Sequence, residues 1–228
     1  MNLSTPLENA NPLVKRYASR LKKLNINTLY DLLTHYPFRY DDFSLISPIE
    51  KIQAGEIVTV QGEITEIKNQ YIRKGRSLQK AKLADATGIV EITWFNQPYI
   101  TKTLVKGSRV SVSGRVGDFR FQLNKKTIES PDYEMLSENQ KPIHTGRLVP
   151  VYPETRGVSS KWLRRQVYTL LNNSLDQIQE HLPKILLEKN RMKDLQTSIQ
   201  HIHFPNSYEE SVKARERLAF DELFLMQL

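Results

Sequence analysis

Cysteine is absent from the 228 residues of this chain, which excludes disulfides and thiolate metal sites. The absence fits a reducing compartment, and we expect a cytoplasmic protein. Long apolar runs are absent too, since none approaches the roughly 18 residues that a bilayer span needs. Residues 1–5 are polar and no basic stretch leads into an apolar one, so the sequence predicts neither secretion nor membrane insertion.

Signatures of catalysis are also missing. No Walker loop, nucleophile elbow or zinc-protease motif is present. The five histidines include the pair His201 and His203, but no third ligand stands at a familiar spacing. The adjacent acids Asp41 and Asp42 are of a kind that caps or pairs locally more often than it holds Mg²⁺. We expect no catalytic residue, no metal site and no cofactor within these residues.

Positive charge is concentrated in one stretch. Between Lys68 and Lys126 there are thirteen Lys or Arg residues and three acids, a balance of +10. Because the whole chain carries +8, the remaining residues sum to about −2. Such a stretch attracts polyanions in general, so acidic membranes and acidic proteins compete with nucleic acid as partners. The basic stretch alternates like strands and does not follow one helical face, which favours nucleic acid.

The first fifty residues read as helical. Apolar residues at helical spacing predict one helix from Leu13 to Leu24. Thr28 is expected to cap a second helix, which Pro37 ends. Asn25 lies between the two, where a left-handed residue is expected. A helical hairpin follows from this pattern.

From Glu56 the apolar period changes to two, which is typical of strands. Three strands, a short helix and two more strands are expected, with these inward apolar residues in chain order: Val58, Val60, Ile64; Ala81, Leu83; Val90, Ile92, Trp94; helical Ile100, Leu104; Val110, Val112, Val116; Phe119, Phe121, Leu123. Arg109, Ser111, Ser113 and Arg115 are expected to point outward. This order predicts an α+β chain in which a five-stranded OB-fold barrel is flanked by an N-terminal helical hairpin and a C-terminal helical segment.

Four segments are expected along the chain: residues 1–50 as an N-terminal helical region, 51–136 as the OB-fold domain, 137–158 as an extended linker and 159–228 as a helical segment. In the last segment Ser159 or Ser160 can cap a helix, and Pro183 can start a second. A third is expected over 208–228. No stop signal follows it, so we expect the chain to lead into a further domain.

Phe95 and Tyr99 are the candidate base-stacking residues. If Val90, Ile92 and Trp94 fill the barrel, alternation sends Phe95 to the outer face. Tyr99 follows four residues later and can share that face at a helix start. The alternative, given equal weight, is that both aromatics pack against the N-terminal helices or the linker.

Basic side chains within the charged stretch can follow a phosphate backbone, and a merely solvated surface is the alternative. The candidates for phosphate binding are Arg73, Lys74, Arg76, Lys80, Lys82, Arg109, Arg115, Arg120, Lys125 and Lys126.

Five phrases stand in an order that resembles one known family. They are NTLYDLLTHYPFRYDD at 27–42, WFNQPY at 94–99, LVPVYPET at 148–155, IHFP at 202–205 and ARERLAFDELF at 214–224. Each phrase is short, but their joint order is specific. Over nearly its whole length the chain resembles the N-terminal region of the RecG family of bacterial ATP-dependent DNA helicases.

The resemblance implies a function. The family's OB-fold is a wedge that engages branched DNA at stalled forks, with two aromatics stacked on bases at the junction; these match Phe95 and Tyr99 here. ATP and Mg²⁺ are used by a helicase motor, whose motifs do not occur in these residues, so no activity is expected of them alone. Residues 148–228 are expected to dock on that motor, and we expect a monomer whose partner is branched DNA, with fork regression and branch migration in recombination and repair as the role.

Two other readings stay open. The chain can be a non-catalytic OB-fold module that binds single-stranded DNA or tRNA and prefers unbranched strands. It can also be a protein-interaction platform, in which the helices after Ser159 dock a partner and the basic strands only aid solubility.

Overall fold

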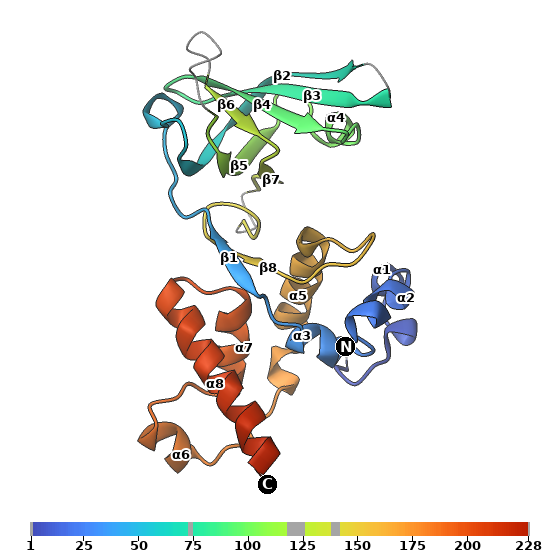
Figure 1. The fold of residues 1–228 in the computed structure, drawn as a ribbon, viewed down its shortest axis with the longest axis vertical. Coiled ribbons are helices and arrows are strands. Elements are labelled where there is room, and N and C mark those ends of the chain that lie inside the picture. Colours follow the sequence, from blue (N-terminus) through green and yellow to red (C-terminus); the bar gives the residue numbers. More distant parts are fainter. Residues whose placement is uncertain (1, 73–74, 118–125, 138–141, 228) are drawn as a thin grey trace. The chain divides into compact units, whose positions relative to one another are not determined.

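A computed structural model of the chain describes residues 2–72, 75–117, 126–137 and 142–227, whose elements Figure 1 labels. The chain forms two compact units, residues 42–149 and residues 1–41 together with 150–228. We call them the barrel unit and the helical unit. They group the chain without testing the four segments expected from sequence, whose boundaries stay a prediction.

The elements have the following bounds. The barrel unit contains β2 (Ile57–Tyr71), β3 (Ser77–Ala84), β4 (Ile89–Phe95), α4 (Ile100–Thr103), β5 (Arg109–Arg115), β6 (Thr127–Glu129) and β7 (Asp132–Met135). The helical unit contains α1 (Pro12–Lys15), α2 (Ala18–Leu21), α3 (Leu29–Thr34), α5 (Ser160–Ser174), α6 (Lys184–Lys189), α7 (Leu195–His203) and α8 (Tyr208–Gln227). The chain passes between the units at β1 (Arg39–Asp42) and β8 (Leu148–Val151), which pair in a two-stranded sheet.

Five strands close the barrel (Figure 1). Antiparallel pairs run from β4 through β3 and β2 to β5. The short β6 pairs in parallel with β4, and a bridge between Val116 and Ile128 joins it to the end of β5. With α4 between β4 and β5 in the chain, this is the strand order of an OB-fold, and the expected α+β fold is confirmed.

Among the described residues the fifth strand of the barrel is β6. Phe119, Phe121 and Leu123 were expected to form this strand, and they lie outside the described residues. Ile128 stands opposite Ile92 in the parallel register, so its side chain fills the barrel from this strand. Beyond the barrel, β7 adds a further antiparallel strand along the free edge of β5.

The barrel core consists of the inward residues that the period of two predicts. Those on β2 to β5 are almost fully buried: Val58, Val60, Ile64, Ala81, Leu83, Val90, Ile92, Trp94, Val110 and Val112. Ile100 and Leu104 bring α4 onto the same core. Gly62 allows β2 and β3 to approach closely, because a Cβ there would lie 2.3 Å from the carbonyl oxygen of Ala84.

Ser111 and Ser113 face away from the barrel interior, as the alternation predicts, since Val110 and Val112 between and beside them fill the core. Both serines are nevertheless buried. The hydroxyl of Thr59 lies 2.6 Å from that of Ser113 and donates to the carbonyl oxygen of Phe43 at 2.7 Å. Covering the outer face with backbone that accepts hydrogen bonds suits small polar side chains.

The start of the helical unit departs from the expected single helix. The pattern from Leu13 to Leu24 is split into α1 and α2 at Tyr17, whose backbone leaves helical geometry. Tyr17 packs its ring on Trp162 of α5, with ring centroids 4.7 Å apart. Asn25 adopts φ 60° and the left-handed conformation expected of it.

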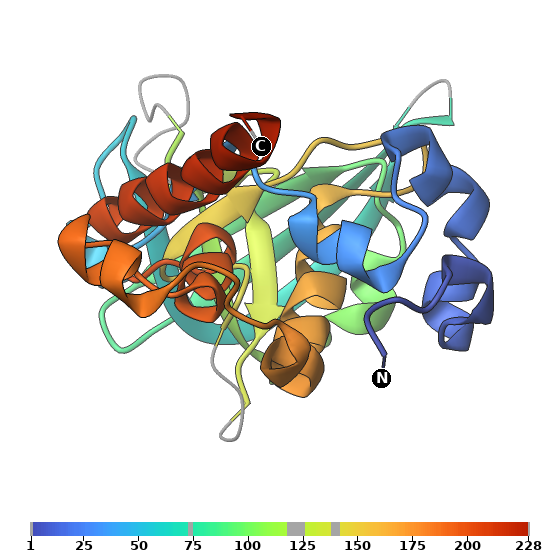
Figure 2. The same cartoon turned by 90° about the horizontal axis from the view of Figure 1, so that it is seen from below.

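The second expected helix, α3, begins as the sequence predicts. Thr28 and Asp31 form a capping box, in which each side chain accepts a backbone N–H of the other residue. Later, Ser159 caps α5 by accepting the N–H of Trp162, and Pro183 precedes α6. Figure 2 shows the long α8 in red beside α7. None of the helices in the described part of the chain combines the length and apolar character that crossing a bilayer requires.

A buried chain of hydrogen bonds ties the helical unit together. The Tyr152 hydroxyl donates to Nδ1 of His203 at 2.9 Å, and Nε2–H of His203 donates to the carbonyl oxygen of Leu33 at 2.7 Å. Since a carbonyl can only accept, Nε2 carries the proton of the neutral ring. Burial lowers the pKa of His203 to about 4. This series of hydrogen bonds links α3, the segment after β8, and α7.

Candidate nucleic-acid interface

The last two residues of β4 divide between the barrel core and its surface. Trp94 is 1% exposed, its Nε1–H donates to the carbonyl oxygen of Pro131 at 3.0 Å, and its ring meets Tyr133 edge-on. Phe95 is 47% exposed on the outer face, where alternation places it. The buried neighbour anchors the strand end, so the Phe95 ring is held out on rigid backbone.

A polar network fixes the turn after Phe95. Asn96 has φ 56°, a left-handed conformation that Asn tolerates, and its N–H donates to the carbonyl oxygen of Ser77 at 2.8 Å. The Asn96 side chain in turn accepts the N–H of Ser77 at 3.0 Å. Gln79, which is fully buried, accepts the N–H of Gln97 at 2.8 Å and donates to Asn69 and Ser77. The turn is thereby bonded to β3 and not free to swing.

Tyr99 stands on the far side of this turn, at the start of α4. Its ring is 56% exposed, and its hydroxyl donates to Oε1 of Gln97 at 2.6 Å. Partial burial raises its pKa. The two residues after it on the inner side, Ile100 and Leu104, are buried in the barrel core, so α4 is seated firmly. Phe95 and Tyr99 are thus two exposed rings on either side of one rigid turn.

The aromatic pair belongs to a surface that we call the β3 face. It consists of the outward residues of three neighbouring strands, which the register arranges in rows: Glu66, Lys82 and Glu91; Lys68, Lys80 and Thr93; Gln70, Leu78 and Phe95. Successive rows are about 7 Å apart along the strands. The face therefore runs from a row with two carboxylates, through a row with two ammoniums, to the row that ends in Phe95.

Six of the ten candidate phosphate-binding residues lie in the described part of the chain. Lys82 pairs with Glu66 at 2.7 Å, and a guanidinium nitrogen of Arg115 donates to the carbonyl oxygen of Gly55 at 2.7 Å. Lys126 donates to two backbone carbonyls, those of Ile49 and Glu50. These three cations have structural partners.

The other three differ. Arg76, Lys80 and Arg109 are exposed, and their side chains form no ion pair with another described residue. Arg73, Lys74, Arg120 and Lys125 lie outside the described residues. Phosphate binding by any of the ten stays a prediction; Lys80 lies on β3, and Arg76 directly precedes that strand.

Sequence reasoning missed Lys68 and Glu66. Strict alternation from Val58, Val60 and Ile64 would turn both inward, but the register of β2 shifts between Ile64 and Glu66. This bulge reverses the alternation, so Ile67 packs on the core and Lys68 points out. Isoleucine at 67, an odd position after even ones, is the signal that could have revealed it.

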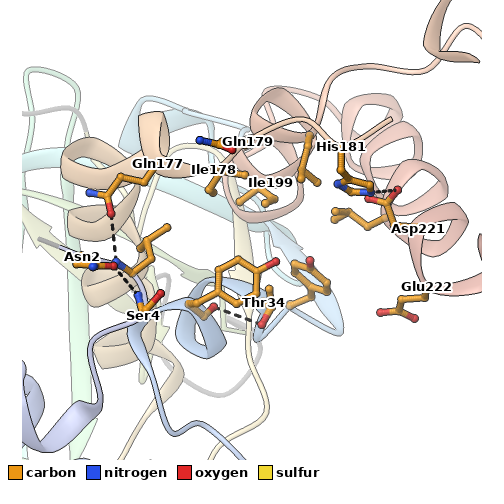
Figure 3. A pocket seen from close by; sticks show the side chains of 15 residues that line it. Asn2, Ser4, Thr34, Gln177, Ile178, Gln179, His181, Ile199, Asp221 and Glu222 are labelled. Carbon is orange, nitrogen blue, oxygen red and sulfur yellow. Dashed lines mark hydrogen bonds and ion pairs between the residues drawn. The ribbon is translucent and has the colours of Figure 1, made fainter. Parts of the chain in front are cut away.

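A cavity of about 890 Å³ lies in the helical unit, apart from this surface (Figure 3). Its lining includes Tyr30, Tyr36, His181, Asp221 and Glu222. His181 points at Asp221, with 3.1 Å between Nε2 and Oδ1, as the dashed line in Figure 3 marks. Carboxylates in the lining do not suit a phosphate ligand, so we do not assign nucleic acid to this cavity.

The acids considered as Mg²⁺ ligands are occupied locally. Asp41 pairs with Arg39. Asp42 accepts hydrogen bonds from the hydroxyl and N–H of Ser44, which lower its pKa. Within residues 2–72, 75–117, 126–137 and 142–227, no three His, Asp or Glu side chains gather as a metal ion would need.

Comparison with known proteins finds similar proteins that match the whole length of this chain. A family model described as the RecG wedge domain matches residues 9–173. The ATP-dependent DNA helicase RecG of Thermotoga maritima is 31% identical over 100% of this chain, and that of a Synechocystis strain is 32% identical over 100%. A solved structure of RecG bound to a three-way DNA junction covers 100% of this chain with TM-score 0.81 and 30% identity.

These likenesses cover only part of each relative. The chain spans 29% of the length of both helicases and 31% of the solved chain. The matched region includes β4, the turn after it and α4, which carry the exposed aromatic pair.

Proposed function

The chain belongs to the RecG wedge domain family, and on that premise we propose that it is the branched-DNA binding part of an ATP-dependent DNA helicase. The helicase regresses stalled forks and drives branch migration in recombination and repair. The proposal is supported by the match to residues 9–173 and by the likeness to a structure of RecG bound to a three-way DNA junction.

Phe95 and Tyr99 stack on the bases where the arms of the junction part. The observation that carries this role is that Phe95 is exposed beside a buried Trp94, on a strand end that the Gln79 network holds fixed. A stacked base contributes about 1 to 3 kcal/mol in single-strand binding proteins, and stacking tolerates any base sequence. A surface that must open junctions of any sequence needs that tolerance.

Basic side chains hold the backbones of the arms. Arg76, Lys80 and Arg109 are exposed and unpaired among the described residues, and they give the contact its dependence on salt. A lysine or arginine at one of the remaining candidate positions adds to the positive potential that attracts phosphates, provided that its charge is not already bound to another group of the protein.

ATP hydrolysis with Mg²⁺ belongs to a motor outside the 29% of the relatives that this chain spans. Residues 148–228 dock on that motor, and the chain alone hydrolyses no ATP. The four segments 1–50, 51–136, 137–158 and 159–228 are its working parts, with 51–136 as the wedge. The protein acts as a monomer in the cytoplasm.

Fluorescence titration of the chain with a labelled three-way fork, linear duplex and single strand tests the proposal. We expect the fork to bind most tightly, with affinity falling steeply between about 50 and 200 mM salt. Equal affinity for all three would overturn junction recognition. Preference for the single strand would instead support a non-catalytic OB-fold module, and salt-insensitive binding of a protein partner would support an interaction platform.

A further inference from the structure

One carboxylate on the β3 face holds two lysines. Glu66 Oε1 pairs with the ammonium of Lys68, and Oε2 lies 2.7 Å from Nζ of Lys82. Hydrogen bonds from these two ammoniums lower the pKa of Glu66 to about 2, and the same contact raises the pKa of Lys82. The carboxylate therefore stays charged at any working pH and uses both of its oxygens on cations.

This cluster of Glu66 and its two lysines lies next to the aromatic pair on the β3 face. Lys68 stands opposite Lys80, in the row directly beside the one that ends in Phe95. Lys82 stands opposite Glu91, in the row beyond. A nucleic-acid strand that runs from Phe95 along β3 would first reach the row of Lys80 and Lys68, where Lys68 is already paired with Glu66. In the next row it would reach Lys82, which is paired with Glu66 as well.

A carboxylate and a phosphate compete for the same donors. Each offers anionic oxygens to an ammonium, and the ion pairs of Glu66 are exposed, so they contribute little to stability and can exchange. Releasing the lysines to a phosphate would leave Glu66 as an unpaired negative charge beside the nucleic acid. That repulsion opposes the exchange.

We propose that Glu66 is a specificity-determining residue that acts as an internal substitute for phosphate. It withholds Lys68 and Lys82 from nucleic acid and so ends the contact surface at Lys80, close to the aromatic pair. A short contact ties binding to the branch point, because a strand without a branch gains little from the rest of the face. The inference rests on the proposed function.

The test is a set of titrations of the full chain with a fluorescein-labelled three-way fork over a range of salt. Glu66→Gln should bind the fork about threefold to tenfold more tightly, with a salt slope steeper by about 1 to 2. Linear duplex should gain more than the fork, so the ratio of fork affinity to duplex affinity falls. Glu56→Gln is the matched control: it removes one carboxylate directly before the start of β2 and keeps an acceptor for the N–H of Gln53.

A double-mutant cycle separates release of the lysines from a general effect of charge. Lys68→Ala with Lys82→Ala should weaken fork binding, because Glu66 is then an unpaired negative charge. Glu66→Gln added to that variant should recover affinity without steepening the salt slope, because no lysine is left to release to phosphate. A slope that steepens equally without the lysines, or equal affinity of Glu66→Gln and wild type, would overturn the inference while leaving fork binding intact. If neither the wild type nor Glu66→Gln binds the fork, the proposed function is overturned, and this inference with it.

Discussion

Trp94 and Phe95 are neighbours on β4 whose side chains lie on opposite faces of the barrel wall, the first 1% and the second 47% exposed. The indole is packed against Tyr133 and bonded to the carbonyl oxygen of Pro131. Because the indole of Trp94 is fixed inside the barrel, the alternation of the strand directs the side chain of Phe95 outward. A large exposed aromatic at a rigid site suits a ligand with flat faces, and this relationship leads to the predictions that follow.

Removing the aromatic pair should separate binding from stability. Phe95→Ala with Tyr99→Ala should weaken fork binding by about 1 to 3 kcal/mol for each lost stack. The free energy of unfolding should change little, because exposed substitutions are usually within about 0.5 kcal/mol. Fork titration and chemical denaturation measure the two effects.

Ile89→Ala is the matched control for that pair, since Ile89 is 58% exposed at the opposite end of β4. It should leave fork affinity unchanged. If the double variant instead loses several kcal/mol of stability, as large-to-small core substitutions do, the two rings serve packing and not stacking.

Lys80 and Lys126 should behave differently although both are basic and lie in the charged stretch. Lys80→Ala should lower the salt slope of fork binding by about 1 and leave stability unchanged. Lys126→Ala removes the bonds to the carbonyls of Ile49 and Glu50, and should cost about 1 kcal/mol of stability with a smaller effect on the slope. Titrations at several salt concentrations and urea unfolding distinguish them. Identical behaviour of the two variants would contradict the assignment.

Gln79→Leu should loosen the turn that separates the aromatics. The N–H of Gln97, which is partly buried, would lose its acceptor, and this should cost about 1 kcal/mol. Fork affinity should fall as well, because Phe95 and Tyr99 are no longer held in place. Gln70→Leu changes an exposed glutamine on β2 and should leave unfolding within about 0.5 kcal/mol of wild type. Wild-type stability of Gln79→Leu would show that the network does not hold the turn.

The buried His203 should make stability fall in mild acid. Its pKa is about 4 in the folded chain, below the value near 6.5 of an exposed histidine. Between these two values the unfolded chain binds a proton that the folded chain does not, so stability is fully present above about pH 6.5 and is lost as the pH falls toward about 4. The loss should total on the order of 3 kcal/mol.

Unfolding measured from pH 7.5 to 4 in wild type and His203→Gln checks this. The difference between the two free energies of unfolding should shrink steadily below about pH 6.5, because only the wild type carries the buried imidazole. A constant difference over that range would mean that His203 charges as readily in the folded chain as in the unfolded one.

Much of the barrel could be predicted because a closed sheet with a filled interior imposes a period of two. Val90, Ile92 and Trp94 show that period without interruption, and their strand lies where expected. On β2 the bulge after Ile64 reverses the alternation, so the outward position of Lys68 could not be read from even spacing. The outward face of Ser111 and Ser113 was predicted correctly, but their burial was not, because alternation tells which face a side chain takes and not what covers that face.

The helical unit was harder to foresee. It joins residues 1–41 to residues 150–228, and contacts such as those of Tyr17 with Trp162 and of Leu33 with His203 link parts far apart in the chain. The helical propensity of a local segment does not depend on such long-range contacts, so it could not predict them. The split of the first helix at Tyr17 follows from tertiary packing, which overrides a helical spacing of apolar residues.

The central claim is that Phe95 and Tyr99 cap the bases at a branch point. It is tested most directly by a three-way fork carrying the fluorescent base 2-aminopurine at the branch, with a second fork carrying it about ten base pairs away. Saturating wild-type chain should change the fluorescence at the branch and not at the distant site, and Phe95→Ala with Tyr99→Ala, also at saturation, should leave both unchanged. Equal changes at the branch with wild type and the double variant would contradict the account.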